Sequence, residues 1–215
     1  KGYSVKGSTL FVTLEPCCHT NKKTPPCVNA IISKGIKQVY FLEYDINPKV
    51  NGNGVKKLES NKIKVSQINL KNKLKEINRG FESIKINNRP FVTLKICTSL
   101  DSKIYTNQIS NNSIGDEIQR KHANNIRKNY DAILVGINTI IKDNPKLNYR
   151  GKNIMVKQPT PIIMDSNLRI PIESNVLKNK SQKPIIFCAT SAPEKKIKIL
   201  ESNKIIVIKL FSKFG

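Results

Sequence analysis

The sequence predicts an α/β protein of two consecutive domains, each with a mostly parallel sheet covered by helices. Short apolar runs of strand length alternate with segments of helical periodicity. A polar stretch at 84–90 interrupts this alternation, which then begins again. The 215 residues, of which 38% are hydrophobic, are enough for one large core or two modest ones. We therefore expect one domain at 1–84 and a second at 85–215.

The first domain is expected to contain three strands and three helices. Its strand-like runs are 9–14, 38–43 and 63–68. Its helical segments are 26–34, 55–60 and 69–80. Gly35 suits the left-handed residue that ends the first helix. The glycine-rich stretch 51–54 predicts a turn, because two glycines are too few for a phosphate-binding fingerprint.

The second domain is expected to open with a strand at 91–96. A helix follows from Ser113 to about Tyr130, with Ser113 and Asp116 as its capping box. Four later apolar runs predict strands, and the residues after the first of them form a loop or short helix. These runs are 132–137, 161–164, 184–188 and 205–208.

A cysteine cluster follows the first strand and predicts a metal site. Cys17, Cys18, His19 and Cys27 lie within eleven residues, and thiolates and imidazoles are the ligands that Zn²⁺ prefers. Pro26 suits the first turn of a helix, which would place Cys27 at a positive helix end and lower its pKa. Two thiolates with a ligand from elsewhere leave a position open for water. The alternative is a proline-rich turn with incidental cysteines.

Composition excludes some classes of protein and leaves one alternative. No apolar run is long enough for a membrane span, and no signal peptide opens the chain. The five cysteines do not form a disulfide framework, which favours a reducing, cytosolic setting. The formal charge of +23 invites a nucleic-acid partner, but the lysines are spread along the chain without a basic and aromatic pattern. Such a field also suits phosphorylated small molecules.

The cysteine stretch and the two blocks after it resemble the deaminase half of the bifunctional riboflavin-biosynthesis deaminase/reductases. The matching stretches are Thr13 to Cys27, Asp45-Ile46-Asn47-Pro48 and Gly52-Asn53-Gly54. The resemblance implies the C-terminal part of a cytidine-deaminase-like zinc domain, with Cys17 and Cys27 as metal ligands. The third ligand and the catalytic proton-shuttle Glu are expected upstream of Lys1, so this polypeptide alone should not deaminate. Cys18 stands where the family usually has Ser, and the cysteine spacing is one residue longer, so either Cys17 or Cys18 remains possible.

A second set of motifs resembles the reductase half of the same enzymes. It comprises Phe91 to Asp101, Ile133-Leu134-Val135-Gly136 with Thr139, Asp143-Asn144-Pro145 with Leu147 and Arg150, and Ile163-Met164-Asp165-Ser166. The resemblance implies a dihydrofolate-reductase-like domain, its C-terminal part missing, that uses NADPH to reduce the ribosyl group of a phosphoribosylamino-uracil to ribityl. The fold class is then α/β, a deaminase-like part followed by a reductase-like part.

Site residues follow from this resemblance, position by position. It implies substrate contacts at Asn111, Arg127, Leu147 and Arg150. It implies NADPH contacts at Cys97, Ser113, Thr139, Asp143 and Ser166. Arginine suits a phosphate dianion, because its planar fork donates two parallel hydrogen bonds. At Ser113 the family often has Trp, so a packing contact with the nicotinamide is expected to be absent.

Three functions remain open at this stage. The first is a bifunctional enzyme, a zinc-dependent pyrimidine deaminase (hydrolase) joined to an NADPH-dependent reductase (oxidoreductase), with a phosphorylated pyrimidine as substrate. The second is a reductase with a degenerate deaminase scaffold. The third is a basic nucleic-acid-binding module derived from a deaminase fold, with salt-dependent binding. Self-association is expected by resemblance, and His122 is expected to be a surface or packing residue of its helix.

Overall fold

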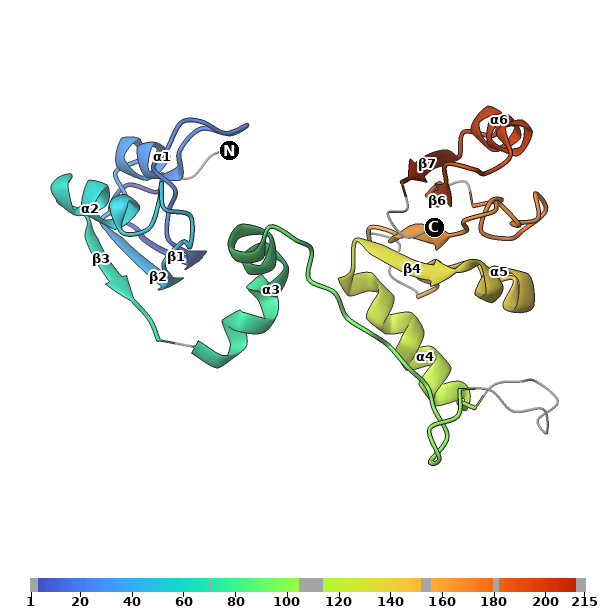
Figure 1. Cartoon of the computed structure of the whole chain (residues 1–215). Helices are drawn as coiled ribbons and strands as arrows, with labels where there is room; N and C mark the ends of the chain where they lie inside the picture. Colours follow the sequence, from blue (N-terminus) through green and yellow to red (C-terminus); the bar gives the residue numbers. More distant parts are fainter. Residues whose placement is uncertain (1–3, 70, 105–113, 152–155, 180–181, 212–215) are drawn as a thin grey trace. The chain divides into compact units, whose positions relative to one another are not determined.

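The computed structural model describes residues 4–69, 71–104, 114–151, 156–179 and 182–211. The chain forms two compact units, Lys1–Lys95 and Ile96–Gly215 (Figure 1). Each unit contains its own parallel sheet and its own hydrophobic core. Among the described residues, no helix combines the length and the apolar character needed to cross a membrane.

The first unit is built on a three-stranded parallel sheet in the order β1-β2-β3. The strands are β1 (Thr9–Leu14), β2 (Gln38–Glu43) and β3 (Lys64–Gln67). Helices α1 (Cys27–Ser33) and α2 (Asn53–Ser60) bury apolar side chains against it, and α3 (Lys71–Asn87) contacts β2. The core comprises Val28, Ile31, Val39, Leu58 and Ile63. Phe11 and Tyr40 stack with ring centroids 5.1 Å apart, and Phe11 remains exposed.

A buried carboxylate joins the end of β1 to the start of α2. Glu15 is only 3% exposed. Its Oε2 accepts a hydrogen bond from the Gly52 amide at 2.9 Å, and its Oε1 accepts one from the Val55 amide at 3.0 Å. Gly52 has φ +73°, and a Cβ at Gly54 would overlap the Pro16 carbonyl oxygen. The glycine-rich turn predicted from the sequence therefore has a specific cause: the backbone must approach Glu15 closely.

The second unit is built on a four-stranded parallel sheet in the order β4-β5-β6-β7. The strands are β4 (Ala132–Gly136), β5 (Thr160–Met164), β6 (Ile185–Ala189) and β7 (Ile206–Leu210). The helices are α4 (Glu117–Ile126), a 3₁₀ turn η1 (Arg127–Asn129), α5 (Ile137–Asp143) and α6 (Glu194–Ser202). Ile140 of α5 and Leu200 of α6 pack with Ile163 and Ile186 of the central strands.

Most of the predicted strands are confirmed, because each combines strand-length apolar character with a neighbour to pair with. The two predicted strands 9–14 and 38–43 coincide with β1 and β2. The helix predicted at 26–34 is α1, and Gly35 follows it with φ +66°. Helix α6 was not predicted, and the segment after β4 forms the helix α5.

The strand predicted at 91–96 is wrong. These residues form no strand, and Val92 and Leu94 are 79% and 80% exposed. A strand needs a neighbouring ladder, and among the described strands β4 pairs with β5 alone. An apolar pattern identifies side chains that suit a strand, but it does not show whether another strand is available to pair with it.

Two other boundaries differ from the predicted ones. Helix α3 continues to Asn87, seven residues beyond the predicted end at residue 80 and through part of the polar stretch expected between the domains. The structure divides the chain after Lys95. Helix α4 is capped by Asp116, whose Oδ1 accepts from the Gln119 amide at 2.7 Å. Asp116 is thus the N-cap itself, and not the N3 residue of a capping box whose N-cap is Ser113.

Replacing Glu15 with Gln should destabilise the first unit. The amide Nε2 would face backbone N–H donors and leave at least one of them without an acceptor, which costs about 1–3 kcal/mol. Urea unfolding followed by the fluorescence of the tyrosines would measure this loss. Glu59→Gln, on the exposed side of α2, is the matched control and should change the free energy of unfolding little. Equal midpoints for the two variants would contradict the role given to Glu15.

Candidate functional site

Two arginines predicted from the sequence lie near enough to each other in the second unit to interact electrostatically. Arg127 lies in η1 and is half-buried, and Arg150 lies in the loop between α5 and β5. Burial, and next the positive charge of Arg150, lower the pKa of Arg127 from its usual value. The Nη1 of Arg127 donates to the Asn148 carbonyl oxygen at 2.9 Å. Two like charges held close together form a site for an anion of more than one charge.

Three side-chain contacts fix the loop that carries Arg150. Gln158 binds the backbone of Tyr149 twice: its Oε1 accepts from the amide at 2.8 Å, and its Nε2 donates to the carbonyl at 3.2 Å. The Arg150 amide donates to Asn124 Oδ1 at 3.2 Å. The side chain of Leu147 is buried in the core, with φ +50°. Leu147 therefore supports the loop by packing. No local sequence pattern indicates the roles of Gln158 and Asn124.

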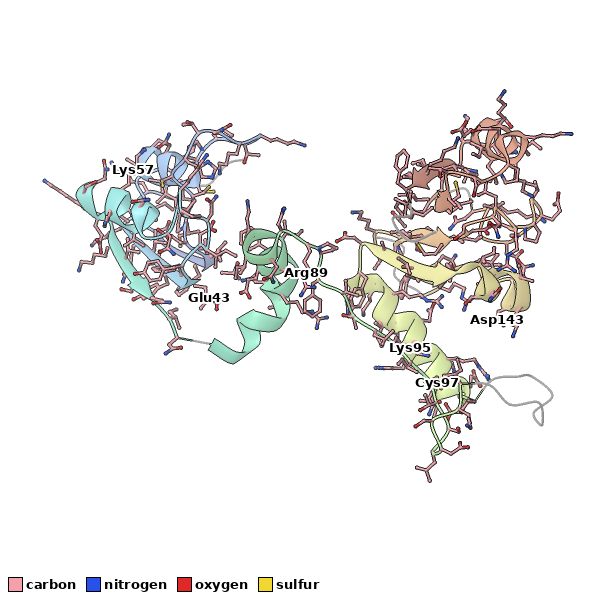
Figure 2. All side chains as sticks on the ribbon, viewed as in Figure 1. Glu43, Lys57, Arg89, Lys95, Cys97 and Asp143 are labelled. Carbon is pink, nitrogen blue, oxygen red and sulfur yellow. The ribbon has the colours of Figure 1, made fainter. Side chains whose placement is uncertain are left out.

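Two predicted cofactor contacts, Thr139 and Ser166, follow the carboxyl ends of β4 and β5, and a third, Asp143, lies at the far end of the helix after β4. Thr139 and Asp143 lie on α5, directly after β4, and Ser166 lies in the turn directly after β5. In open parallel sheets, ligands bind outside the carboxyl ends of the strands. Hydroxyl groups at that edge fit a polar cofactor such as NADPH. Cys97 is not part of this group: it lies beside Gln119 at the start of α4, away from Asp143 (Figure 2).

The turn after β5 is held by a buried acid. Asp165 is 1% exposed, and its carboxylate accepts from the Arg169 amide at 2.9 Å and the Ile170 amide at 2.8 Å. This network fixes Ser166 and Arg169 relative to the sheet. Asn111 and Ser113, the remaining predicted contacts for substrate and cofactor, lie outside the described residues.

In the first unit, the structure brings Cys17 and Cys27 together. The Cys27 amide, in the first turn of α1, donates to Cys17 Sγ at 3.3 Å, and Lys22 Nζ donates to the same sulfur. Burial acts to raise the pKa of Cys17, but these hydrogen bonds outweigh it, so that pKa is lowered. The hydrogen bond between the two thiols, and then burial, raise the pKa of Cys27. The expectation that Cys27 has the lowered pKa is therefore wrong, because the helix amide and Lys22 both point at Cys17.

The described residues of this cluster supply two thiol ligands for a metal. Cys18 Sγ donates to the Lys49 carbonyl oxygen at 3.4 Å, so it is turned away from this pair. In the parts of the chain that the structure describes, no three His, Cys, Asp or Glu side chains converge as a metal site does. A catalytic zinc needs three protein ligands, so the described residues do not complete such a site.

A cavity of about 280 Å³ lies near the carboxyl ends of β1 and β2 in the same unit. Glu43, at the end of β2 (Figure 2), accepts a hydrogen bond at 3.5 Å from Asn78 of α3. The other lining residues are Leu14, Tyr44, Ile46, Asn51, Phe81 and Glu82. Sequence reasoning missed Glu43 and Asn78, because a cavity formed by a strand end and a distant helix has no local pattern.

Both units have a parallel sheet with helices, so the chain is a two-unit protein of the parallel α/β class. The chain belongs to the RibD riboflavin-biosynthesis family, whose C-terminal domain model matches residues 90–213, more than half of the chain. It is 39% identical to the riboflavin biosynthesis protein RibD of Aquifex aeolicus over 98% of this chain and 59% of that protein. It is also 39% identical to RibD of Bacillus amyloliquefaciens, over 91% of this chain and 52% of that protein.

Solved structures of the same family resemble this one across both units. RibD of Acinetobacter baumannii (form 2) matches with a TM-score of 0.79 and 28% identity, over 97% of this chain and 57% of that one. A diaminohydroxyphosphoribosylaminopyrimidine deaminase/5-amino-6-(5-phosphoribosylamino)uracil reductase of Thermotoga maritima matches with a TM-score of 0.73 and 31% identity, over 98% and 64%. The chain spans between half and two thirds of the length of these relatives.

Replacing Lys22 with Met should slow alkylation of Cys17. Loss of the ammonium raises the pKa of Cys17, so less thiolate is present at neutral pH, and the rate should fall by roughly three- to tenfold. The rate in the unmodified protein should persist to lower pH than in the variant. Iodoacetamide labelling in the presence of a chelator, with peptide mapping by mass spectrometry, measures both rates. Lys23→Met, at the exposed neighbouring residue, should leave the Cys17 rate unchanged; equal slowing in both variants would refute the specific contact.

Proposed function

We propose that the second unit is an NADPH-dependent reductase of a phosphorylated ribosylamino-uracil. The observation that carries this proposal is that Arg150, on a loop fixed by side-chain hydrogen bonds, interacts electrostatically with Arg127 of η1. The family membership supports it, since the matched domain is the RibD C-terminal domain. The substrate is the one that the name of the Thermotoga maritima relative contains, 5-amino-6-(5-phosphoribosylamino)uracil.

The proposed roles follow from charge and position. Arg127 and Arg150 bind the phosphate of the substrate. The resemblance adds Leu147, whose buried side chain supports the loop, and Asn111, which lies outside the described residues. Thr139, Asp143 and Ser166 bind the cofactor. The resemblance also assigns to it Cys97, which lies apart from them beside Gln119, and Ser113, which is outside the described residues. NADPH, when bound, supplies the hydride that converts the ribosyl group to ribityl. The task of the protein is to orient the sugar and exclude water, so no protein nucleophile is required.

We propose that the first unit is part of a zinc-dependent pyrimidine deaminase domain. Cys17 and Cys27 would supply two thiolates, and zinc when bound would activate water for attack on the amino-bearing ring carbon. The reaction also needs a third ligand and a proton-shuttle Glu, which the described residues do not bring to this place. A degenerate scaffold beside an active reductase is the alternative. The spread of lysines disfavours the nucleic-acid-binding module.

Replacing Arg150 with Gln should raise the KM for the phosphorylated substrate by roughly 10- to 100-fold, because a charge-assisted hydrogen bond is lost. The kcat should change less, since the phosphate lies away from the reacting carbon. Loss of NADPH absorbance during turnover gives both constants. The control is Arg120→Gln, which removes the same charge from the exposed face of α4. An unchanged KM in Arg150→Gln would contradict the proposal that the arginine pair binds the substrate.

Zinc content should separate the two interpretations of the first unit. If the thiols bind metal, elemental analysis should find about one zinc per chain, and Cys27→Ala should lose it. Cys18→Ser should keep the metal, because Cys18 binds a backbone carbonyl. Absence of zinc from the unmodified protein would favour the degenerate scaffold. Loss of zinc in Cys18→Ser would mean that Cys18, and not Cys17, is the metal ligand.

A further inference from the structure

A pocket of about 410 Å³ lies between the last turns of α3 and the segment that follows this helix. Its volume is within the range of small-molecule sites. The described residues that line it all belong to 79–92, so the pocket lies within the first unit. It shares Glu82 with the cavity near the ends of β1 and β2. None of the residues assigned above to substrate, cofactor or metal lines it.

Helical periodicity and one side-chain hydrogen bond shape this pocket. Arg79, Ser83 and Ile86 are spaced at i, i+4 and i+7, so they lie on one face of α3. Beyond the helix, Asn88 has φ +51°, the left-handed conformation that commonly ends a helix. The hydroxyl of Ser83, a residue only 8% exposed, donates to the Arg89 carbonyl oxygen at 2.9 Å. The segment after α3 is therefore held against the helix face that lines the pocket.

The walls of the pocket combine an apolar surface with two guanidiniums. Ile86, Phe91 and Val92 have exposed apolar side chains there. The guanidinium carbon of Arg79 lies 4.7 Å from the centroid of the Phe91 ring, a cation–π contact that orients both groups. The second guanidinium belongs to Arg89, an exposed residue that follows the end of α3 (Figure 2). The pocket thus offers an apolar wall beside positive charge.

The positive charge of Arg89 is not neutralised by any of the residues that the structure describes. None of the four ion pairs found among them includes Arg89, and the hydrogen bond to Ser83 uses the carbonyl of Arg89, not its guanidinium. Glu82, the carboxylate among the described lining residues, takes part in none of these ion pairs either. Two guanidiniums therefore face one carboxylate, and an arginine fork is suited to bind a phosphate.

We propose that this pocket binds a ligand in which a planar aromatic ring carries a phosphate. The ring packs on Ile86, Phe91 and Val92, and the phosphate is bound by Arg89 with Arg79 beside it. An apolar ligand would leave the guanidiniums without a counter-ion, and a free anion would leave the apolar wall in water. A ligand with both groups satisfies both parts of the pocket. The bound ligand holds the segment 89–92 more firmly against α3.

The experiment compares two probes that differ only in a phosphate. Flavin mononucleotide has a planar aromatic ring and a phosphate, and riboflavin has the same ring without the phosphate. Quenching of flavin fluorescence by the full chain measures both affinities at one fixed ionic strength. The unmodified protein should bind flavin mononucleotide about tenfold or more tightly than riboflavin. In Arg89→Gln this preference should fall to roughly threefold or less, with riboflavin binding unchanged, because a charge-assisted contact is lost.

Hydrogen–deuterium exchange, followed by mass spectrometry, locates the bound probe. The amides of residues 83–92 should exchange more slowly when flavin mononucleotide is present, because the ligand fastens this segment to α3. Phe91→Ala should weaken the binding of both probes by a similar factor, since both use the apolar wall. Its effect therefore differs from that of Arg89→Gln, which should weaken only the phosphorylated probe.

Arg120→Gln is the matched control, since it removes one positive charge from another exposed arginine, and it should keep the full preference. A preference that survives in Arg89→Gln overturns the proposal. A preference that is lost in Arg150→Gln instead also overturns it, because the phosphate then binds in the second unit. Equal binding of the two probes to the unmodified protein, or unaltered exchange at 83–92, has the same consequence. The proposal does not depend on the reductase function, which the KM of Arg150→Gln tests separately.

Discussion

A carboxylate buried at the end of a strand determines the local structure of both units. An ionised acid removed from water is tolerated only where donors surround it, so the chain must turn back and present backbone amides. Glu15 obtains these from Gly52 and Val55, and Asp165 obtains them from Arg169 and Ile170. Each candidate site begins one or two residues later, at Cys17 in one unit and at Ser166 in the other. Both units thus have the same kind of rigid turn after a strand, and they differ in the side chains that follow it.

Much of the architecture follows from the sequence, because apolar runs of strand length with helices between them favour parallel α/β packing. Strands β1, β2, β5, β6 and β7 were predictable for this reason. The segment 91–96 has an equally apolar pattern, yet it forms no strand in the structure. Pairing depends on residues far apart along the chain, and a local pattern contains no information about them.

The candidate sites show the same limit. Resemblance placed Arg127 and Arg150 in one site, and the structure brings them together. Gln158 and Asn124 were missed, since the side chain of each binds a backbone group far away along the chain, and no local pattern indicates such a contact. The thiolate was assigned to Cys27 from its place at a helix start, but the amide of that residue points at Cys17. The start of a helix in the sequence predicts where its positive electrostatic field lies. Only the geometry of the folded chain shows which sulfur that field and the helix amide act on.

The closeness of Arg127 and Arg150 has a consequence for folding. Two guanidiniums that repel one another raise the energy of the empty protein, and a bound dianion removes that repulsion. Binding of the dianion then stabilises the folded loop, and the amount of stabilisation depends on the concentration of the ligand. Under the proposed function, abundance of the phosphorylated substrate would protect this unit from unfolding, and scarcity would expose it to proteolysis.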